Sequence, residues 1–385
     1  MTRPVTEHTT CRVCQHQTLM PYLDLGMQPL ANALIGSEDK EPPLRAPLAI
    51  QACPECGLSQ LTVVVDPNIL YRDYPYTSGV NPAWKAHCQA LADELLLEGK
   101  FVLEVASNDG TFLKTCASRA ARVLGVEPAS NFQGGYPCRE AFWGADIAAD
   151  PAIIGQVDYL VAQNVLGHVH DVHDFMEGVA LALSPTGRAI IEVPYLLDLL
   201  KHTAFDTIYH EHLSYWTVGA LRHLAAAHGL KVNGVMRLRK VHGGSIRAHF
   251  SRDRYTSVST FRLHCQEERR TLTTDTYHAF ANRVRITIER IDAEMPTHGY
   301  GAAAKATVLL NLLTNRPGVV FDDNAGKWGK RIPGTETIVG DPVGMKDCDA
   351  LAILAWNWAD VLMERARARG FTGRFFIPLP EPRWV

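Results

Sequence analysis

Two Cys-x-x-Cys pairs near the start of the chain limit its possible folds more than any other feature. Cys11 and Cys14 form the first pair, and Cys53 and Cys56 form the second. Each pair can turn two thiolates onto one ion, and two pairs complete the tetrahedral ligand set of a structural zinc site. One pair alone would also suit a redox site, so the second pair favours zinc. Four thiolates leave no open coordination position, and we therefore expect no zinc catalysis.

The length and composition of the chain set its general class. Its 385 residues exceed what one ordinary core accommodates, so we expect several domains. It is 46% hydrophobic and 21% charged, and its formal charge of -3 argues against nucleic acid or an anionic membrane as the main partner. The apolar runs are too short to span a bilayer, and the first residues lack a signal-peptide core. We expect a cytoplasmic location, where the nine cysteines would be thiols or metal ligands.

A buried strand predicted at Phe101–Ala106 runs into the small polar turn 107–110 and then into a helix. A turn of small residues between a strand and a helix is where parallel α/β sheets bind nucleotides. This turn lacks the Gly-x-Gly-x-x-Gly pattern that lets a pyrophosphate approach the backbone. Glu104, on the strand, would repel a pyrophosphate but suits a cationic sulfonium. The sequence therefore predicts a site for S-adenosylmethionine.

Three further strands, predicted at Ala121–Val126, Val157–Ala162 and Gly187–Pro194, alternate with helices and indicate a parallel, doubly wound α/β sheet. Glu127 ends the second strand, where an acid can accept both ribose hydroxyls. Asp146 lies in a later loop where an adenine amino group could sit. Each acid would also suit an ordinary surface. The residues that we expect at the cofactor are Glu104, Ala106, Asn108, Gly110, Glu127, Asp146 and Asn164.

The segment Tyr209–His212 places a phenol, two imidazoles and a carboxylate at consecutive positions. Its spacing does not fit the helical His-Glu-x-x-His zinc site, in which two imidazoles lie one turn apart. A site shared by Tyr209 and His212 requires a turn, and a turn would point His210 elsewhere. Taken alone, the segment would equally suit a polar structural turn.

The C-terminal third has the pattern of a second, smaller α/β unit. Residues 252–295 read as one or two amphipathic helices that connect domains. Small residues at 299–304 open a helix, where backbone N–H groups can meet phosphate oxygens. Predicted strands at 319–324 and 351–357 follow it.

Together these features resemble the zinc-containing, S-adenosylmethionine-dependent sugar C-methyltransferases, which act on nucleotide-linked 4-keto-deoxysugars. The resemblance covers nearly the whole chain and departs from the family at Val80–Ala83, where a Ser-rich run would be usual. The segments that carry it are the two cysteine pairs, Leu25–Asn32, Glu104–Gly110, Tyr209–His212, His242–Ser245 and Gly299–Lys305.

We therefore expect three domains. These are a zinc-binding domain at residues 1–70, a Rossmann-like methyltransferase domain at 71–250, and a C-terminal Rossmann-like α/β domain for the nucleotide sugar at 251–385. The resemblance implies a monomer or a weak homo-oligomer that takes part in deoxysugar biosynthesis, with a nucleotide-linked sugar, expected to carry dTDP, as substrate. The residues expected to bind that substrate are Tyr300, Ala303, Lys305, Lys327 and Arg331.

Methylation of carbon beside a ketone requires a base for the α-proton, a donor facing the enolate oxygen and a methyl group in line. The resemblance implies that His212 is the base and that C-3 of the sugar is methylated. Tyr209 would donate to the oxyanion, Glu211 would orient or polarise an imidazole, and His168 would lie near the keto oxygen. Tyr76, which from the sequence alone suits aromatic packing, would reach in as a second phenol.

Two other readings stay open on the sequence. One is an O- or N-methyltransferase with the same cofactor domain. The other is a zinc-stapled nucleotide-binding module without chemistry. His170 and His173 lie near His168, but their spacing fits no known ligand set, and we expect them to face solvent.

Overall fold

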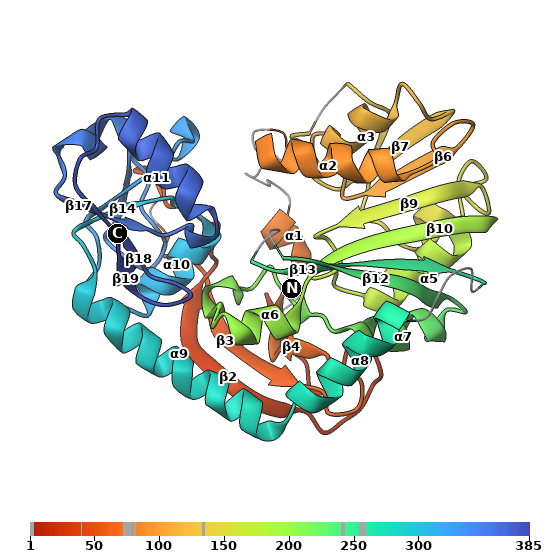
Figure 1. Cartoon of the computed structure of the whole chain (residues 1–385), viewed down its shortest axis with the longest axis horizontal. Helices are drawn as coiled ribbons and strands as arrows, with labels where there is room; N and C mark the ends of the chain where they lie inside the picture. The colour runs from red at the N-terminus through yellow and green to blue at the C-terminus, as the bar shows by residue number, and fades with distance from the viewer. Residues whose placement is uncertain are drawn as a thin grey trace.

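The computed structural model describes residues 4–39, 41–71, 79, 82–132, 135–239, 243–253 and 259–385. Tyr76 lies outside these residues, so the structure does not test its predicted role, and His242, the first residue of the motif His242–Ser245, also lies outside them. Three strand-and-helix units follow one another along the chain, with the last two forming the sides of a U and the first lying near its base (Figure 1). Among the described residues, no helix has the length and apolar character that crossing a membrane requires.

The middle unit is built on a seven-stranded sheet with the strand order β12-β13-β10-β9-β6-β7-β8. Strands β8, β7, β6, β9 and β10 are parallel, and β13 and β12 complete the sheet in antiparallel fashion. The strand bounds are β6 Phe101–Val105, β7 Arg122–Glu127, β8 Cys138–Glu140, β9 Val157–Gln163, β10 Leu183–Pro194, β12 Lys231–Leu238 and β13 Ser245–Ser251. Because β6 has β7 on one side and β9 on the other, the doubly wound order predicted from the sequence is confirmed.

Helices cover both faces of this sheet. Val102 and Val161 pack on one face against α2 (Pro82–Glu94) and α3 (Thr111–Cys116). Leu103 follows Val102 in the chain, and Leu160 precedes Val161. These two leucines pack on the opposite face of the sheet, against a second group of helices. Those helices are α4 (Ala145–Ala148), α5 (Val172–Ala182) and α7 (Val218–Ala227). Successive strand residues point to opposite faces, so a nearly continuous apolar strand is buried on both sides.

The N-terminal unit contains a four-stranded antiparallel sheet with the order β11-β4-β3-β2. Its strands are β2 Met20–Pro29, β3 Arg45–Ala52, β4 Ser59–Leu61 and β11 Ser214–Tyr215. Strand β11 comes from the segment directly after His212, so the middle unit supplies the edge strand of the N-terminal sheet. A separate two-stranded sheet pairs β1 (Val5–Glu7) with β5 (Val63–Val65), and the short helix α1 (Pro67–Tyr71) follows.

The C-terminal unit is a six-stranded sheet with the order β16-β15-β14-β17-β18-β19, parallel apart from β19. This confirms the second α/β unit. Its strands are β14 His298–Tyr300, β15 Val319–Phe321, β16 Ile338–Gly340, β17 Ala350–Ile353, β18 Arg374–Ile377 and β19 Arg383–Trp384. Its helices are α10 (Ala304–Asn311) and α11 (Ala359–Ala368), with short 3-10 turns η3 Ala325–Lys327, η4 Pro342–Asp347 and η5 Trp356–Trp358.

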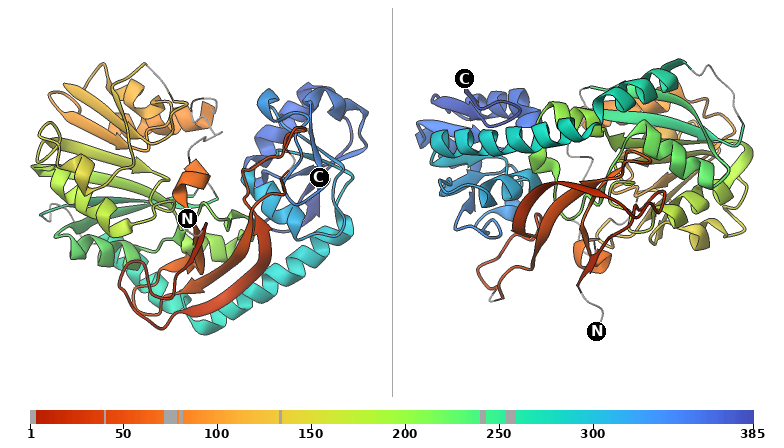
Figure 2. Two further views of the ribbon diagram at one scale, coloured as in Figure 1. Left: turned by 180° about the vertical axis from the view of Figure 1, so that it is seen from behind. Right: turned by 90° about the horizontal axis from the view of Figure 1, so that it is seen from below.

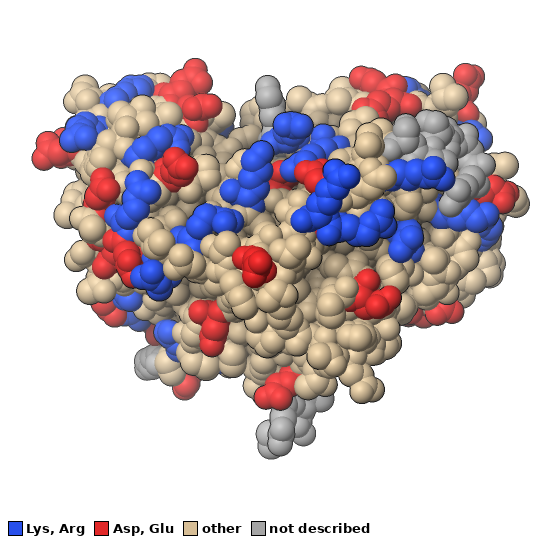
Figure 3. All heavy atoms as spheres, turned by 60° about the horizontal axis from the view of Figure 1, so that its bottom comes forward, with Lys and Arg blue, Asp and Glu red and all other residues tan. Residues whose placement is uncertain are grey.

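Two helices, α8 (Ser259–Thr271) and α9 (Thr274–Glu294), connect the second and third units, and α9 runs beside β2 along the base of the U (Figures 1 and 2). Exposed arginines lie along both helices, and Figure 3 shows Lys and Arg gathered on this side of the molecule. The predicted helical connector is thus present as two helices.

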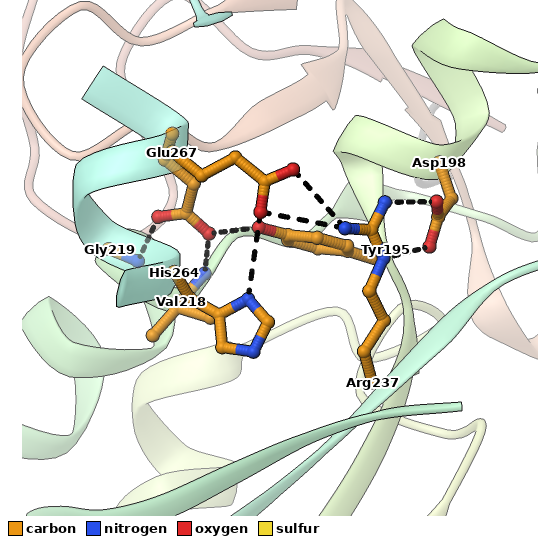
Figure 4. A network of polar contacts seen from close by, with 8 residues as sticks. Tyr195, Asp198, Val218, Gly219, Arg237, His264 and Glu267 are labelled. Carbon is orange, nitrogen blue, oxygen red and sulfur yellow. Dashed lines mark hydrogen bonds and ion pairs between the residues drawn. The ribbon is translucent and has the colours of Figure 1, made fainter. Parts of the chain in front are cut away.

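Helix α8 packs on the middle unit, although it follows residue 251. One carboxylate oxygen of Glu268 accepts the N–H of Val218 at 2.6 Å and the hydroxyl of Tyr195 at 3.0 Å, and the other accepts the N–H of Gly219 at 2.9 Å. Glu268 therefore satisfies free N–H groups at the start of α7. In the same network Arg237 lies between Asp198 and Glu267 (Figure 4).

Candidate active site

The four cysteine sulfur atoms of the N-terminal pairs meet at one point. Cys11 and Cys56 lie 3.5 Å apart, Cys14 and Cys53 also lie 3.5 Å apart, and all four sulfur atoms are within 4.8 Å of one another. Zinc–thiolate bonds of about 2.3 Å in a tetrahedron place sulfur atoms roughly 3.8 Å apart. The arrangement fits a structural zinc ion. We call this group and its two loops the zinc clip.

Tyr209–His212 forms a turn, as a site shared by its two ends requires. The N–H of His212 donates to the carbonyl of Tyr209 at 2.8 Å, and the two rings lie 3.9 Å apart. The preceding 3-10 turn η2 (Phe205–Thr207) and the following strand β11 fix both ends of the segment. His210 points away, with Nε2 donating to the carbonyl of Pro47 at 3.2 Å. Burial also lowers the pKa of His210, which disfavours its charged form.

The hydrogen bonds of His212 determine which of its ring nitrogens can act as a base. Nδ1 lies 2.7 Å from the carbonyl oxygen of Thr207, which can only accept, so Nδ1 carries the proton. In the neutral ring Nε2 is then the acceptor, and it receives the hydroxyl proton of Tyr209 at 2.8 Å. The basic nitrogen is thus aimed at the phenol that lies next to it.

Glu211 has a different partner from the one expected. Its Oε1 accepts the side-chain amide of Asn32 at 3.0 Å, and within the described part of the chain Oε2 is buried without a partner. Burial raises the pKa of Glu211 to about 7. The role of Glu211 in orienting or polarising an imidazole stays a prediction, and no hydrogen bond among the described residues joins its carboxylate to His212 or His168. The reason is that the segment after β2 brings Asn32 against it.

His168 lies beside His212 after strand β9, with ring centroids 4.8 Å apart in an edge-to-face arrangement. The hydroxyl of Tyr71 donates to the carbonyl of Glu211 at 2.9 Å and lies 3.3 Å from Nδ1 of His168. Because that hydroxyl has a single hydrogen, Nδ1 is the donor in the contact and Nε2 is left as an acceptor. Burial lowers the pKa of His168 to about 4, so the ring is neutral.

Most residues expected at the cofactor gather at the carboxyl ends of β6, β7 and β9. Ala106, Asn108, Gly110 and Asn164 all adopt positive φ, between 49° and 72°, so the chain turns sharply where each strand ends. Glu127 accepts the N–H groups of Asn108 at 2.8 Å and Ala129 at 2.9 Å, which fixes its carboxylate.

Two of these residues carry polar atoms that fit a cofactor. Oε2 of Glu104 and Oδ1 of Asn164 are buried without a hydrogen-bond partner among the described residues. Burial raises the pKa of Glu104, and the negative charge of Glu127 raises it further. A cationic ligand would relieve this repulsion and give both oxygens a partner. Asp146 is exposed at the start of α4, and its side chain accepts the N–H of Ile147.

Two close contacts were not predicted at the turn 107–110, which we call the cofactor loop. The N–H of Gly79 donates to Oδ2 of Asp109 at 2.8 Å, while Oδ1 accepts from the hydroxyl of Thr111 at 2.6 Å. The ring of Tyr136 fills the space beside Gly110, where a Cβ would lie 2.2 Å from it. Asp109 belongs to the Glu104–Gly110 motif, which is the signal that could have identified it.

The residues expected to bind the substrate divide into two groups. Ala303 is the N-cap of α10, and Lys305 lies in the first turn of that helix. The side-chain polar groups of the others have partners within the C-terminal unit. Tyr300 donates to Asp323 at 2.7 Å, Lys327 donates to the carbonyl of Ala302 at 2.8 Å, and Arg331 pairs with Glu336 at 3.2 Å.

Lys305 lies where the middle and C-terminal units meet. Its Nζ lies 4.7 Å from the centre of the Trp356 ring and donates to Asn357 at 3.3 Å. The indole N–H of Trp356 donates at 2.7 Å to the fully buried Asp206. Burial raises the pKa of Asp206 to about 6 and lowers that of Lys305. Asp206 precedes Thr207, the residue that holds His212, so the turn η2 connects Lys305 to the proposed base.

Asp206, Asn32 and Tyr71 were missed because their partners are distant in the chain. For Asn32 a signal exists, since it ends the Leu25–Asn32 motif. Asp206 stands in no motif, and neither does Tyr71, the last residue of α1.

Family models match three consecutive parts of the chain. A zinc-binding domain matches residues 11–71, a methyltransferase domain matches 76–233, and a C-methyltransferase C-terminal domain matches 240–380. The C-methyltransferase NovU of Streptomyces niveus is 32% identical over 415 aligned positions, which cover 100% of this chain and 97% of that protein.

Solved structures match more distantly. The PH0226 protein of Pyrococcus horikoshii is 13% identical with a TM-score of 0.37 and covers 48% of this chain and 98% of its own. The 1,6-didemethyltoxoflavin-N1-methyltransferase of Burkholderia thailandensis is 15% identical with a TM-score of 0.34 and covers 45% of this chain and 79% of its own. The family models and the full-length relative carry the assignment, and these structures add nothing to it. The chain belongs to the zinc-containing, S-adenosylmethionine-dependent C-methyltransferases.

Proposed function

We propose that this enzyme methylates C-3 of a nucleotide-linked 4-keto-deoxysugar, with dTDP as the nucleotide, after removing the α-proton at that carbon. The observation that supports the proposal is the pair Tyr209–His212, in which the hydrogen bonds of the imidazole leave Nε2 as its acceptor nitrogen, directly against a phenol. A carbon next to a ketone needs these two groups, one to take the proton and one to bind the enolate oxygen. S-adenosylmethionine supplies an electrophilic methyl group.

His212 acts as the base through Nε2. As that nitrogen takes the α-proton, the carbonyl of Thr207 remains bonded to Nδ1–H and stabilises the imidazolium. Tyr209, whose hydroxyl bonds Nε2 in the structure, turns its proton to the keto oxygen and releases the nitrogen for the reaction. The hydrogen bond from Tyr209 to Nε2 is thereby replaced by one from Tyr209 to the keto oxygen, and Nε2 faces the α-hydrogen.

Toward the substrate, His168 accepts a hydrogen bond through Nε2 and does not donate one. Because its Nε2 is the unprotonated nitrogen of a neutral ring, it binds a sugar hydroxyl, and the keto oxygen is left to Tyr209. Glu211, bonded to Asn32, supports the turn from behind and does not touch the substrate.

The nucleotide is bound by the C-terminal unit. The helix start at Ala303 offers backbone N–H groups to a diphosphate, and Lys305 adds a positive charge. The position of Lys305 next to Trp356 and Asp206 supports this assignment, because the sugar would then extend from the C-terminal unit toward His212. Tyr300 and Lys327 support the strand and loop behind the site, and Arg331 lies outside it.

The test is to incubate the enzyme with a dTDP-linked 4-keto-deoxysugar and S-adenosylmethionine labelled with ¹³C in its methyl group. Long-range proton–carbon NMR correlations identify the atom that receives the label. The proposal expects a methyl carbon bonded to C-3. A methyl group on oxygen or nitrogen would instead identify an O- or N-methyltransferase, and no transfer to any 4-keto nucleotide sugar would reject this substrate class.

A further inference from the structure

Arg12 lies inside the zinc clip, between the ligands Cys11 and Cys14, yet its side chain leaves the clip. It is 6% exposed, and its Nη2 donates to the carbonyls of Val169 and His170, each at 2.5 Å. Its own N–H donates to the side chain of Gln60 at 2.9 Å. The position of Arg12 is therefore fixed from both ends of the residue.

The two carbonyls belong to the loop 164–171, which connects β9 to α5 and carries His168. On the other side of His168, the carbonyl of Gly167 accepts the N–H groups of Leu213 at 2.7 Å and Ser214 at 3.2 Å. His168 thus has the turn of His212 attached to the residue before it and the zinc clip attached to the residues after it.

Burial lowers the pKa of the Arg12 guanidinium, and the nearby negative charge of Asp171 partly offsets this effect. Nε and Nη1 of Arg12 are buried and have no hydrogen-bond partner among the described residues. A buried cation that is so incompletely bonded needs a neighbouring negative charge. The carboxylate of Asp171 is one such charge, and four thiolates around one Zn²⁺, with Cys11 directly before Arg12 in the chain, would supply another.

We propose that Arg12 is a positioning residue that couples zinc occupancy of the clip to the placement of His168. The proposal rests on the proposed function for the role of His168 in the reaction, but the attachment itself can be measured without turnover. Zinc fixes the short loop between Cys11 and Cys14 that carries Arg12, and Arg12 in turn holds the loop 164–171 beside the turn of His212. Loss of zinc releases Arg12 and loosens the loop.

The experiment uses the full-length zinc-loaded enzyme with three variants. Arg12→Met keeps the length of the side chain but removes its charge and donors, Arg12→Lys restores a charged donor, and Arg262→Met alters an exposed arginine on α8 as a control. The readouts are bound zinc, amide hydrogen exchange in the loop, the imidazole NMR signal of His168 assigned with His168→Gln, and kcat and KM.

Arg12→Met is expected to retain zinc, to speed hydrogen exchange at residues 165–170 about tenfold or more, to shift the His168 signal, and to lower kcat more than it changes KM. Arg12→Lys should recover part of each effect, and Arg262→Met should resemble the wild type. Zinc removal should loosen the loop in the wild type, and in Arg12→Met it should loosen the loop little further, since the link is already broken.

Unchanged exchange and an unchanged His168 signal in zinc-loaded Arg12→Met would overturn the proposal. So would equal further loosening by zinc removal in the variant and the wild type. If Arg12→Met and Arg12→Lys both lose zinc, Arg12 is part of the clip's own fold and the proposal also fails. Failure of the proposed function is distinguishable, because it would appear as absent methyl transfer in the wild type while the exchange and NMR results still stand.

Discussion

The hydroxyl of Tyr209 donates to Nε2 of His212 at 2.8 Å, while Nδ1 of the same ring donates to the carbonyl of Thr207. The two bonds together fix the ring in one orientation and one tautomer. A base prepared in this way needs no reorientation when the substrate arrives, and preorganisation of that kind is a large part of what an active site contributes.

Replacing His212 by Asn should reduce methyl transfer by about 10²–10⁴-fold, the usual contribution of a general base. Affinity for S-adenosylmethionine, measured by calorimetry, should stay within a factor of about two, because the cofactor contacts lie at other strand ends. Exchange of the sugar α-proton with deuterated solvent, followed without methyl donor, should be lost in parallel. Tyr209→Phe is the companion variant and should slow exchange while leaving Nε2 basic. Normal exchange in His212→Asn would exclude it as the base.

Replacing Glu211 by Gln should change how stability depends on pH. Burial raises the pKa of Glu211 from 4.5 to about 7, so the folded protein binds this proton more tightly than the unfolded chain does. Its contribution is fully present below about pH 4.5 and is lost as the pH rises to about 7. Over that interval the wild type should lose up to a few kcal/mol relative to Glu211→Gln. Thermal unfolding midpoints of both proteins measure this, and parallel curves would contradict it.

Replacing Cys14 by Ser should lower bound zinc and destabilise the N-terminal sheet, because metal binding and folding of such a site are coupled. The effect should extend to β11, which pairs with β4. Metal analysis and hydrogen exchange of residues 213–215 provide the measurement. Cys138→Ser is the matched control, since Cys138 is exposed and lies outside the cluster. Equal zinc content in both variants would show that Cys14 is not a ligand.

Replacing Lys305 by Met should raise the KM for the nucleotide sugar by about tenfold to a hundredfold, the value of a charge-assisted hydrogen bond. The affinity for S-adenosylmethionine should not change. Lys330→Met removes an exposed lysine of the same unit and serves as control. If Lys305→Met instead lowers the affinity for S-adenosylmethionine, the methyl-donor site and the nucleotide-sugar site have been assigned to the wrong units.

Replacing Gly79 by Ala should weaken S-adenosylmethionine binding by about tenfold. A Cβ at this position would lie 2.3 Å from Oδ2 of Asp109 and 2.9 Å from the hydroxyl of Thr111, so the N–H bond to Asp109 could not form. Gly318→Ala, where a Cβ meets open space, is the control. Calorimetric titration with the methyl donor compares the two, and equal affinities would show that Gly79 does not support the cofactor loop.

The sequence allowed correct predictions wherever short spacing determines geometry. The cysteine pairs close on one point because each pair needs only a tight loop. Glu104 and Glu127 end neighbouring strands because parallel strands present their carboxyl ends at one edge of a sheet. Tyr209 and His212 lie next to each other because they are the two ends of a four-residue turn.

Partners set by the approach of distant segments could not be predicted in this way. Glu211 was expected to orient or polarise an imidazole. In the structure its carboxylate accepts a hydrogen bond from Asn32, which follows β2. Asp206 binds Trp356, which lies in another unit of the protein. Periodicity describes which face of an element is buried, and it does not say which remote side chain covers that face.

Strand β11 completes the N-terminal sheet although it lies far beyond that sheet in the chain, and this has a consequence for biosynthesis. When the ribosome has finished the cysteine pairs and strands β2 to β4, the open edge of β4 must wait for Ser214 and Tyr215 to emerge. An unpaired strand edge can bind the wrong partner, and nascent chains expose such edges while they grow. The turn that bears His212 therefore reaches its final structure only when β11 pairs with β4 and completes the N-terminal sheet. A chain that ends before this segment has neither the complete sheet nor the proposed base.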